Sequence, residues 1–212
     1  MQNDVQEAIK WQPLLHAAEI GVTAKDGVVS LTGVVDSYAK KTETENAAKN
    51  VAGVTALVEK IEVRYPNSYN KTNAEIAGEV VSALTARWDV PEEKVKIKVE
   101  AGWVTLTGEV GWNYEREAAR DAIKHLTGVI GVSNDITIKS ETQEAVEKAG
   151  IESALRRNWA SYDEDISVEV SGHRAILTGT VESLYEKEEA GRIAWNAPGV
   201  WSVDNELVVD WD

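Results

Sequence analysis

A three-fold internal repeat constrains the fold of this 212-residue chain more than any other feature. The tripeptide Leu-Thr-Gly occurs three times, at 31–33, 106–108 and 177–179. In each copy a second glycine, followed by valine, stands 20 residues after the first; the pairs are Gly33 and Gly53, Gly108 and Gly128, and Gly179 and Gly199. A motif pair repeated in constant register indicates duplication of one structural unit. We therefore interpret the six glycines as fold-defining and predict three domains: domain 1 at 1–66, domain 2 at 72–139 and domain 3 at 143–212.

Each repeat predicts the same order of elements: helix, strand, strand, helix, strand. In domain 2, Val95, Ile97 and Val99 alternate with lysines, which is the period of a half-buried strand. In domain 1, Asp26-Gly27 predicts the tight turn between the first two strands, and Ser37 predicts the N-cap of the second helix. A hairpin pairs antiparallel, whereas a strand–helix–strand crossover joins parallel strands. The expected fold class is α+β, with three tandem αββαβ units, each a three-stranded mixed sheet packed against two helices.

The second helix of domain 2 shows its expected burial face as residues at i, i+4 and i+8 spacing. This stripe consists of Tyr114, Ala118, Ala122 and Leu126, with Ala119 and Ile123 beside it. Two polar segments predict the linkers between domains, namely Asn67-Ser68-Tyr69-Asn70 and Ser140-Glu141-Thr142.

Charge and composition restrict the class of function. The net charge is −14, and residues 142–212 hold 6 basic and 15 acidic side chains. This balance repels polyphosphate, so we expect no nucleic-acid partner. Without cysteine there is no disulfide or thiolate chemistry. No apolar run reaches about 18 residues, and the first residues lack the features of a signal peptide, which predicts a cytoplasmic protein as the sequence stands and a periplasmic one if a signal was removed.

The sequence contains no motif for catalysis or for a cofactor. Its three histidines, His16, His125 and His173, lie far apart and without ligand spacing, so no metal site is expected. Neither a Gly-x-Ser-x-Gly elbow, a P-loop nor a dinucleotide glycine motif occurs. We therefore expect a protein that is not an enzyme and uses no cofactor.

The closing segment of each domain carries a family resemblance. Domain 2 reads Gly-Val-Ile-Gly-Val-Ser-Asn-Asp-Ile-Thr-Ile at 128–138, and domain 3 reads Gly-Val-Trp-Ser-Val-Asp-Asn-Glu-Leu-Val-Val at 199–209. With the Leu-Thr-Gly tripeptide and the order of elements, this pattern resembles the BON domain, a bacterial family named for an osmotic-stress protein and nodulation proteins. Domain 1 departs from the pattern, with Leu57 in place of the valine and Glu59 in place of the asparagine.

The resemblance implies a function without catalysis. BON domains are associated with phospholipid or cell-envelope surfaces and with protection of bacteria under osmotic stress, and many members are exported to the periplasm. The expected function is therefore that of a stress-associated binding protein. Its expected partner is phospholipid or an envelope protein.

Aromatic usage indicates where such a surface would lie. The chain has eight Trp, six Tyr and no Phe, and these two residue types suit boundaries between apolar and wet surroundings. Strand alternation in domain 2 predicts that Lys94, Lys96 and Lys98 lie on the face opposite the apolar residues, beside Trp103. A lipid headgroup would find cations and an aromatic ring on that face. Contact between domains or chains, and plain solvent exposure, are the alternative interpretations.

The remaining tryptophans divide into two groups. Those without a tryptophan counterpart in the other domains are predicted to contact a neighbouring domain or a partner; they are Trp112, Trp195, Trp201 and Trp211. Trp88 and Trp159 occupy equivalent places at the end of first helices, so we predict that they pack in the core or against the helix end. The alternative function is a structural assembly protein, which forms homo-oligomers through Trp-bearing sheet faces and has no lipid role.

Overall fold

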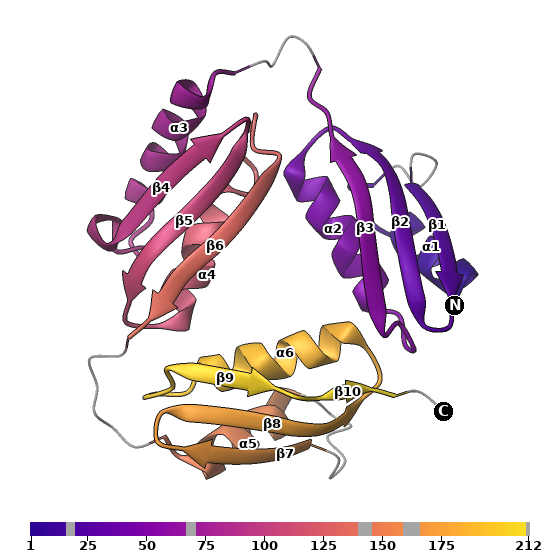
Figure 1. Ribbon diagram of the computed structural model, residues 1–212, viewed down its shortest axis with the longest axis vertical. Helices are drawn as coiled ribbons and strands as arrows, with labels where there is room; N and C mark the ends of the chain where they lie inside the picture. The colour runs from indigo at the N-terminus through magenta and orange to yellow at the C-terminus, as the bar shows by residue number, and fades with distance from the viewer. Residues whose placement is uncertain (16–19, 67–70, 140–145, 159–165, 211–212) are drawn as a thin grey trace.

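The chain folds into three domains arranged around a common centre (Figure 1). The computed structural model describes residues 1–15, 20–66, 71–139, 146–158 and 166–210. The predicted linker segments at 67–70 and 140–142, together with Trp159, Trp211 and His16, lie outside the described residues. Each domain has its own apolar core, built around Leu31, Leu106 and Leu177 respectively, so the three units are three separate folding cores.

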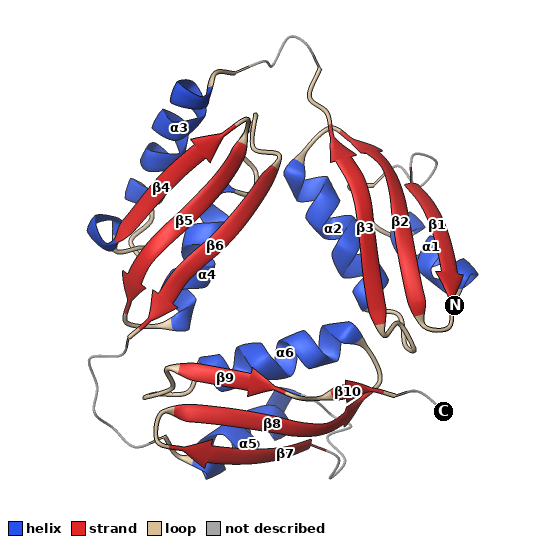
Figure 2. Cartoon of the chain, in the orientation of Figure 1, coloured by secondary structure: helices blue, strands red, loops and turns tan. Residues whose placement is uncertain are grey.

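The three domains share one order of elements (Figure 2). Domain 1 contains α1 (Gln2–Lys10), β1 (Ile20–Lys25), β2 (Val28–Val35), α2 (Tyr38–Lys49) and β3 (Ala56–Val63). Domain 2 contains α3 (Asn73–Thr85), the 3₁₀ helix η3 (Glu92–Lys94), β4 (Val95–Glu100), β5 (Trp103–Val110), α4 (Asn113–Ile123) and β6 (Gly131–Ile138). Domain 3 contains α5 (Lys148–Asn158), β7 (Ile166–Ser171), β8 (Arg174–Val181), α6 (Leu184–Trp195), β9 (Ser202–Asn205) and β10 (Val208–Val209).

Each sheet is mixed, as the repeat predicts. In domain 2, β4 pairs antiparallel with β5, and β5 pairs parallel with β6. Domain 1 has the same order. In domain 3 the last strand is divided into β9 and β10, and both pair parallel with β8 in one unchanged register. The expected α+β class with three αββαβ units is therefore confirmed.

Local chemistry accounts for the turns and helix starts. Asp26 and Gly27 both have positive φ, 51° and 78°, which suits the tight turn between β1 and β2. The Ser37 hydroxyl accepts a hydrogen bond from the Lys40 N–H at 3.4 Å and caps α2. At the start of α3, Thr72 and Glu75 form a reciprocal capping box.

Two repeated glycines have a backbone reason to be glycine. Gly108, near the end of β5, has φ of 143°, and an added Cβ would overlap the Lys94 carbonyl. Gly128, in the turn after α4, has φ of 96°. L side chains rarely adopt either conformation.

The buried face of α4 differs in part from the predicted stripe. Ala118, Ala119 and Ile123 are buried against the sheet. Tyr114, however, is 50 % exposed, and its ring stacks on Trp112 with centroids 6.5 Å apart. The prediction that Tyr114 belongs to the buried face was wrong: the buried residue at the start of α4 is instead its neighbour Asn113, which is 2 % exposed.

The asparagine of the closing pattern ties the last strand to the second helix. Asn134 donates through Nδ2 to the Arg116 carbonyl at 2.8 Å, and Asn205 does the same for the Lys187 carbonyl at 2.5 Å. In domain 1 the equivalent Glu59 instead forms an ion pair with Lys41, at 2.8 Å. The departure of domain 1 from the pattern therefore replaces a backbone hydrogen bond by a side-chain pair.

The domains contact one another in a cycle around the three second helices, α2, α4 and α6 (Figure 1). The start of α2 lies against the turn that follows α4. Tyr38 packs against the core of domain 2. The Tyr65 hydroxyl donates to the Val129 carbonyl at 2.8 Å. Burial raises the pKa of this hydroxyl, so it remains a donor at neutral pH.

The contact between domains 2 and 3 uses equivalent positions. Asn113, at the start of α4, donates through Nδ2 to Asn196 Oδ1 at 3.3 Å, just beyond the end of α6. The Arg116 guanidinium lies 4.6 Å from the centroid of the Trp195 ring, and Trp195 packs against the cores of both domains.

The contact between domains 3 and 1 closes the cycle. Leu184, at the start of α6, packs against the core of domain 1. The Gly53 N–H donates to the Glu182 carbonyl at 2.9 Å, and Lys49 forms an ion pair with Glu188 at 2.6 Å. Three versions of one head-to-tail contact therefore form a closed ring within a single chain.

All three sheets turn their open faces to the same side of this ring. In Figure 2 the strands lie in front, and α1, α4 and α5 lie behind them. An approximate three-fold arrangement explains this, because a rotation about the ring axis carries one sheet onto the next without moving its open face to the other side of the ring.

Candidate functional site: the open sheet face of domain 2

The open face of the domain 2 sheet presents the predicted lysines and Trp103 to solvent. Val104 and Leu106 of β5 are fully buried on the opposite face. On β4, Lys96 and Lys98 are exposed and stand opposite Thr107 and Thr105 of β5. Lys94 was predicted to start this strand, but it lies in η3, because the chain turns through a 3₁₀ helix before β4 begins.

Trp103 leans away from the lysines, toward β6. It is 44 % exposed, and its Nε1 donates to the Ser133 hydroxyl at 3.0 Å. Its ring covers Gly131, where a Cβ would collide with it. Because Gly131 has no side chain, the Trp103 indole can lie flat on the open face over β6. Trp103 is in the diagonal position to Lys98 across β4 and β5.

The charges on this face are partly neutralised. Lys98 forms an ion pair with Glu100 at 2.9 Å, and both side chains are well exposed. Among the residues that the structure describes, Lys96 makes no ion pair. It lines a shallow depression of about 770 Å³ at the end of the sheet, together with Glu93, Lys94, Gly108, Glu109, Val110, Thr137 and Lys139. An anionic group placed there would meet three lysines, one of which, Lys139, pairs with Glu109 at 3.4 Å.

The structure places the other predicted tryptophans on different surfaces. Trp112 precedes α4 and stacks on Tyr114, while Trp195 lies in the contact between domains 2 and 3. Trp201 is 40 % exposed and stacks on His173 of domain 3, with ring centroids 3.9 Å apart. These residues do not form one site with Trp103.

Among the described residues, the two most exposed tryptophans are Trp88, for which the sequence prediction failed, and Trp11, for which the sequence made no prediction. Trp88 is 94 % exposed, so the prediction of core or helix-end packing was wrong. The reason is that α3 ends at Thr85, and the core position beyond it is filled by Val90. Trp11, which follows α1, is 82 % exposed. Both precede a proline by two or three residues, a signal that the chain has already left the helix.

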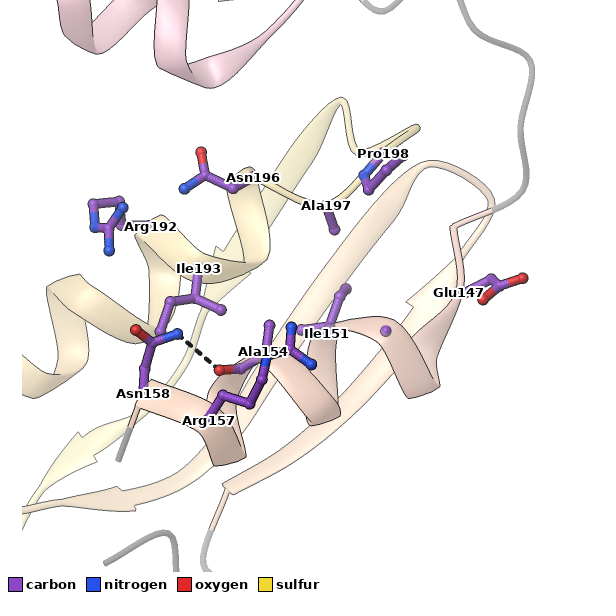
Figure 3. Close-up of a pocket in the computed structure, with 11 residues that line it drawn as sticks. Glu147, Ile151, Ala154, Arg157, Asn158, Arg192, Ile193, Asn196, Ala197 and Pro198 are labelled. Atoms are coloured by element: carbon purple, nitrogen blue, oxygen red, sulfur yellow. Dashed lines mark hydrogen bonds between the residues drawn. The ribbon is translucent and has the colours of Figure 1, made fainter. Parts of the chain in front are cut away.

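A second hollow lies in domain 3, between α5 and α6 (Figure 3). Its volume is about 880 Å³, and Ile151, Ala154 and Ile193 form part of its wall. Arg157 and Asn158 lie at one end, and Glu147 lies at the other. The Asn158 side chain donates to the Ala154 carbonyl at 2.9 Å. This hydrogen bond lies within α5 and does not reach across the hollow.

Within the described ranges, no cluster of three or more His, Asp or Glu side chains could hold a metal ion. No described helix has the length and apolar character needed to cross a membrane. The open face carries lysine cations, threonine hydroxyls and the Trp103 indole, which suit ion pairing with anions, hydrogen bonding and aromatic contact.

Comparison with known proteins places these features in a family. The model of the BON domain matches residues 1–65, 72–140 and 145–210. Osmotically-inducible protein Y of Escherichia coli (strain K12) is 30 % identical over 129 residues, which are 59 % of this chain and 64 % of the relative, so the match spans less than two thirds of that protein. An uncharacterized protein from the gshII 5′ region of Anaplasma centrale is 47 % identical over 47 residues, 22 % of this chain and 31 % of the relative.

A solved structure of CdsD, a structural protein of the type III secretion system of Chlamydia trachomatis, covers 98 % of this chain and 91 % of its own, at 14 % identity and a TM-score of 0.27. This similarity is too low to carry an argument. The three matches of the BON model, in contrast, coincide with the three cores. The chain belongs to the BON domain family, and it carries three BON domains in tandem.

Proposed function

We propose that this chain is a stress-associated binding protein, without catalysis, that docks on phospholipid or another cell-envelope surface. The family resemblance suggests the surface, and the osmotically inducible relative suggests the stress. The ring arrangement favours a flat surface such as a membrane as the partner, because all three open sheet faces lie on one side of the ring.

One observation carries the proposal. Lys96 is exposed and, within the described part of the chain, has no ion pair, on the same open face as the half-exposed Trp103. An unpaired cation and an aromatic ring on one sheet face suit the boundary between headgroups and acyl chains.

The binding free energy that the lysines can supply predicts a weak and salt-dependent contact with the membrane. A lysine near an anionic membrane contributes about 1 kcal/mol, so Lys94, Lys96 and Lys98 contribute at most roughly 3 kcal/mol together, and the ion pair of Lys98 with Glu100 reduces this sum. A millimolar Kd corresponds to about −4.1 kcal/mol. The net charge of −14 opposes the approach of the whole chain. The lysines alone therefore fall short of stable binding, and insertion of Trp103 is needed to complete it.

Vesicle flotation tests the proposal. The purified chain is mixed with neutral vesicles and with vesicles that contain anionic phospholipid, across a salt series. We expect flotation with anionic vesicles at low salt only, and its loss in Lys96→Glu and Trp103→Ala variants. Lys10→Glu is the matched control, because it changes the net charge equally but lies on α1, behind the sheet of domain 1. If the chain floats with neither vesicle, direct phospholipid contact is ruled out.

A second candidate function is assembly of several copies. On the open face of domain 1, Val28, Val34 and Val58 are 38, 37 and 40 % exposed. These valines share their face with Thr32, Lys60 and Glu62, and such a partly apolar face suits a contact with another copy of the chain. Sedimentation analysis separates the two functions, since an apolar assembly keeps its mass at high salt while a lysine contact weakens.

A further inference from the structure

We propose that the centre of the ring binds a small zwitterionic solute, with a carboxylate at one end and a cationic nitrogen at the other. The second helices α2, α4 and α6 surround a cavity of about 560 Å³ there, and each domain supplies part of its wall. Cavities of this size are typical of small-molecule sites. The inference concerns a different surface from the open sheet face and does not depend on membrane docking.

Most charged side chains that line the cavity already have partners. Arg120 pairs with Glu117 at 2.6 Å, and Lys49 pairs with the lining residue Glu188, also at 2.6 Å. The Nε of Arg192 donates to Glu189 at 2.7 Å. Three lining carboxylates are therefore paired, two of them with lining arginines and the third, Glu188, with Lys49, which lies outside the wall.

Arg116 is the lining cation that these pairs leave over. Its nearest carboxylate is Glu117 at 3.8 Å, which is beyond hydrogen-bond distance and is already held by Arg120. Burial lowers the pKa of Arg116, although a guanidinium remains charged at any physiological pH. Its guanidinium carbon lies over the Trp195 ring. A half-buried guanidinium with no carboxylate within hydrogen-bond distance is complementary to a carboxylate ligand, which it can hold with two hydrogen bonds.

Glu43 is the lining carboxylate that these pairs leave over. It lines the cavity from α2 and is half-buried, and among the described residues it forms no ion pair. A cationic nitrogen would supply its missing partner. Tyr185 also lines the cavity, and aromatic faces attract ammonium groups, quaternary ones included, whereas the Trp195 ring already meets Arg116.

A solute with both charges would connect the domains. Glu43 belongs to domain 1, Arg116 to domain 2 and Trp195 to domain 3, so the bound solute touches every domain of the ring. A ligand that binds only the closed ring stabilises that arrangement by mass action. The cavity thus links the concentration of a solute to the closure of the ring.

Isothermal titration calorimetry on the whole chain tests the inference. The probes are glycine betaine and L-proline, which carry both charges. Acetate and choline, which carry one each, and trehalose, which carries none, are the comparison solutes at matched ionic strength. We expect saturable binding of a zwitterion, and binding at least about tenfold weaker in Arg116→Gln and in Glu43→Gln, because each leaves a charge of the ligand unpaired.

Two further variants keep the test decisive. Arg64→Gln removes a guanidinium that pairs with Glu62 at the end of β3, outside the cavity, and should bind as the unmodified chain does. Arg116→Lys keeps the charge but loses the bidentate geometry, so it should fold normally and bind more weakly. The inference is overturned if no zwitterion binds saturably, if choline or acetate binds equally well, or if Arg116→Gln and Arg64→Gln bind alike.

Discussion

Replacing Gly108 by alanine should destabilise domain 2 by about 1–6 kcal/mol. A non-glycine residue held in a glycine-only region of φ and ψ costs about 1–3 kcal/mol, and Gly108 has φ of 143°. The new methyl group would also overlap the Lys94 carbonyl, and overpacking of this kind costs about 1–3 kcal/mol. The entropy that alanine removes from the unfolded chain offsets only about 0.4–1 kcal/mol.

The structure offers a matched control in the same domain. Gly78 lies within α3, and an added Cβ there would meet no atom within 4 Å. Alanine at this position should stabilise domain 2 by about 0.5–1 kcal/mol, because it is the better helix former. The same substitution, glycine to alanine, therefore has opposite signs at two places in one domain.

Hydrogen exchange resolved by peptide is the appropriate measurement, because a chain of three domains need not unfold in one two-state step. Amides of β4 and β5 should lose protection in Gly108→Ala and gain it in Gly78→Ala. A change below about 0.5 kcal/mol at Gly108 would refute the backbone argument, since that is the range of an ordinary surface substitution.

Two further predictions concern a buried carboxyl and a domain contact. Burial raises the pKa of Glu45 above its ordinary value of 4.5, so its ionisation opposes folding and its contribution to stability is lost as pH rises through the raised pKa. Glu45→Gln should therefore raise the melting temperature of domain 1 at pH 7 and leave it nearly unchanged below 4.5; an equal gain at both pH values would contradict this cause. Tyr65→Phe removes the hydrogen bond to the Val129 carbonyl and should weaken the contact between domains 1 and 2 by about 0.5–1.5 kcal/mol. Small-angle scattering should then show a more open ring, and an unchanged scattering profile would contradict a role of this hydrogen bond in maintaining the contact.

The repeat made the fold predictable, because the same pattern of strands, helices and turns occurs in all three domains. Where the pattern is ambiguous in one copy, the other two copies indicate the element. In domain 2, Val95, Ile97 and Val99 alternate as expected of a half-buried strand, and in domain 1 Asp26-Gly27 marks the equivalent hairpin turn by its local backbone preference. Fold-level prediction therefore needed only short-range rules.

The candidate site was predictable only in part, because it depends on where side chains lean and where helices stop. Alternation placed Lys96 and Trp103 on one face, but only the structure shows that the indole turns to Ser133 and Gly131. Trp88 was misplaced because spacing alone continued the helix past Thr85. The pairing of Arg116 with Trp195 joins two domains, and no periodicity within one domain encodes such a contact.

The closed ring has a consequence for the number of domains. A head-to-tail contact that does not close continues indefinitely and produces a filament, whereas one that closes uses every head and every tail. Here the start of each second helix already meets the end of the next, with Leu184 of domain 3 returning to domain 1. A fourth BON domain would find no vacant place in this cycle. The rotation between neighbouring domains thus closes the ring after three domains. The surfaces that form the contacts between domains are buried inside the ring, and only its faces and rim can meet other molecules.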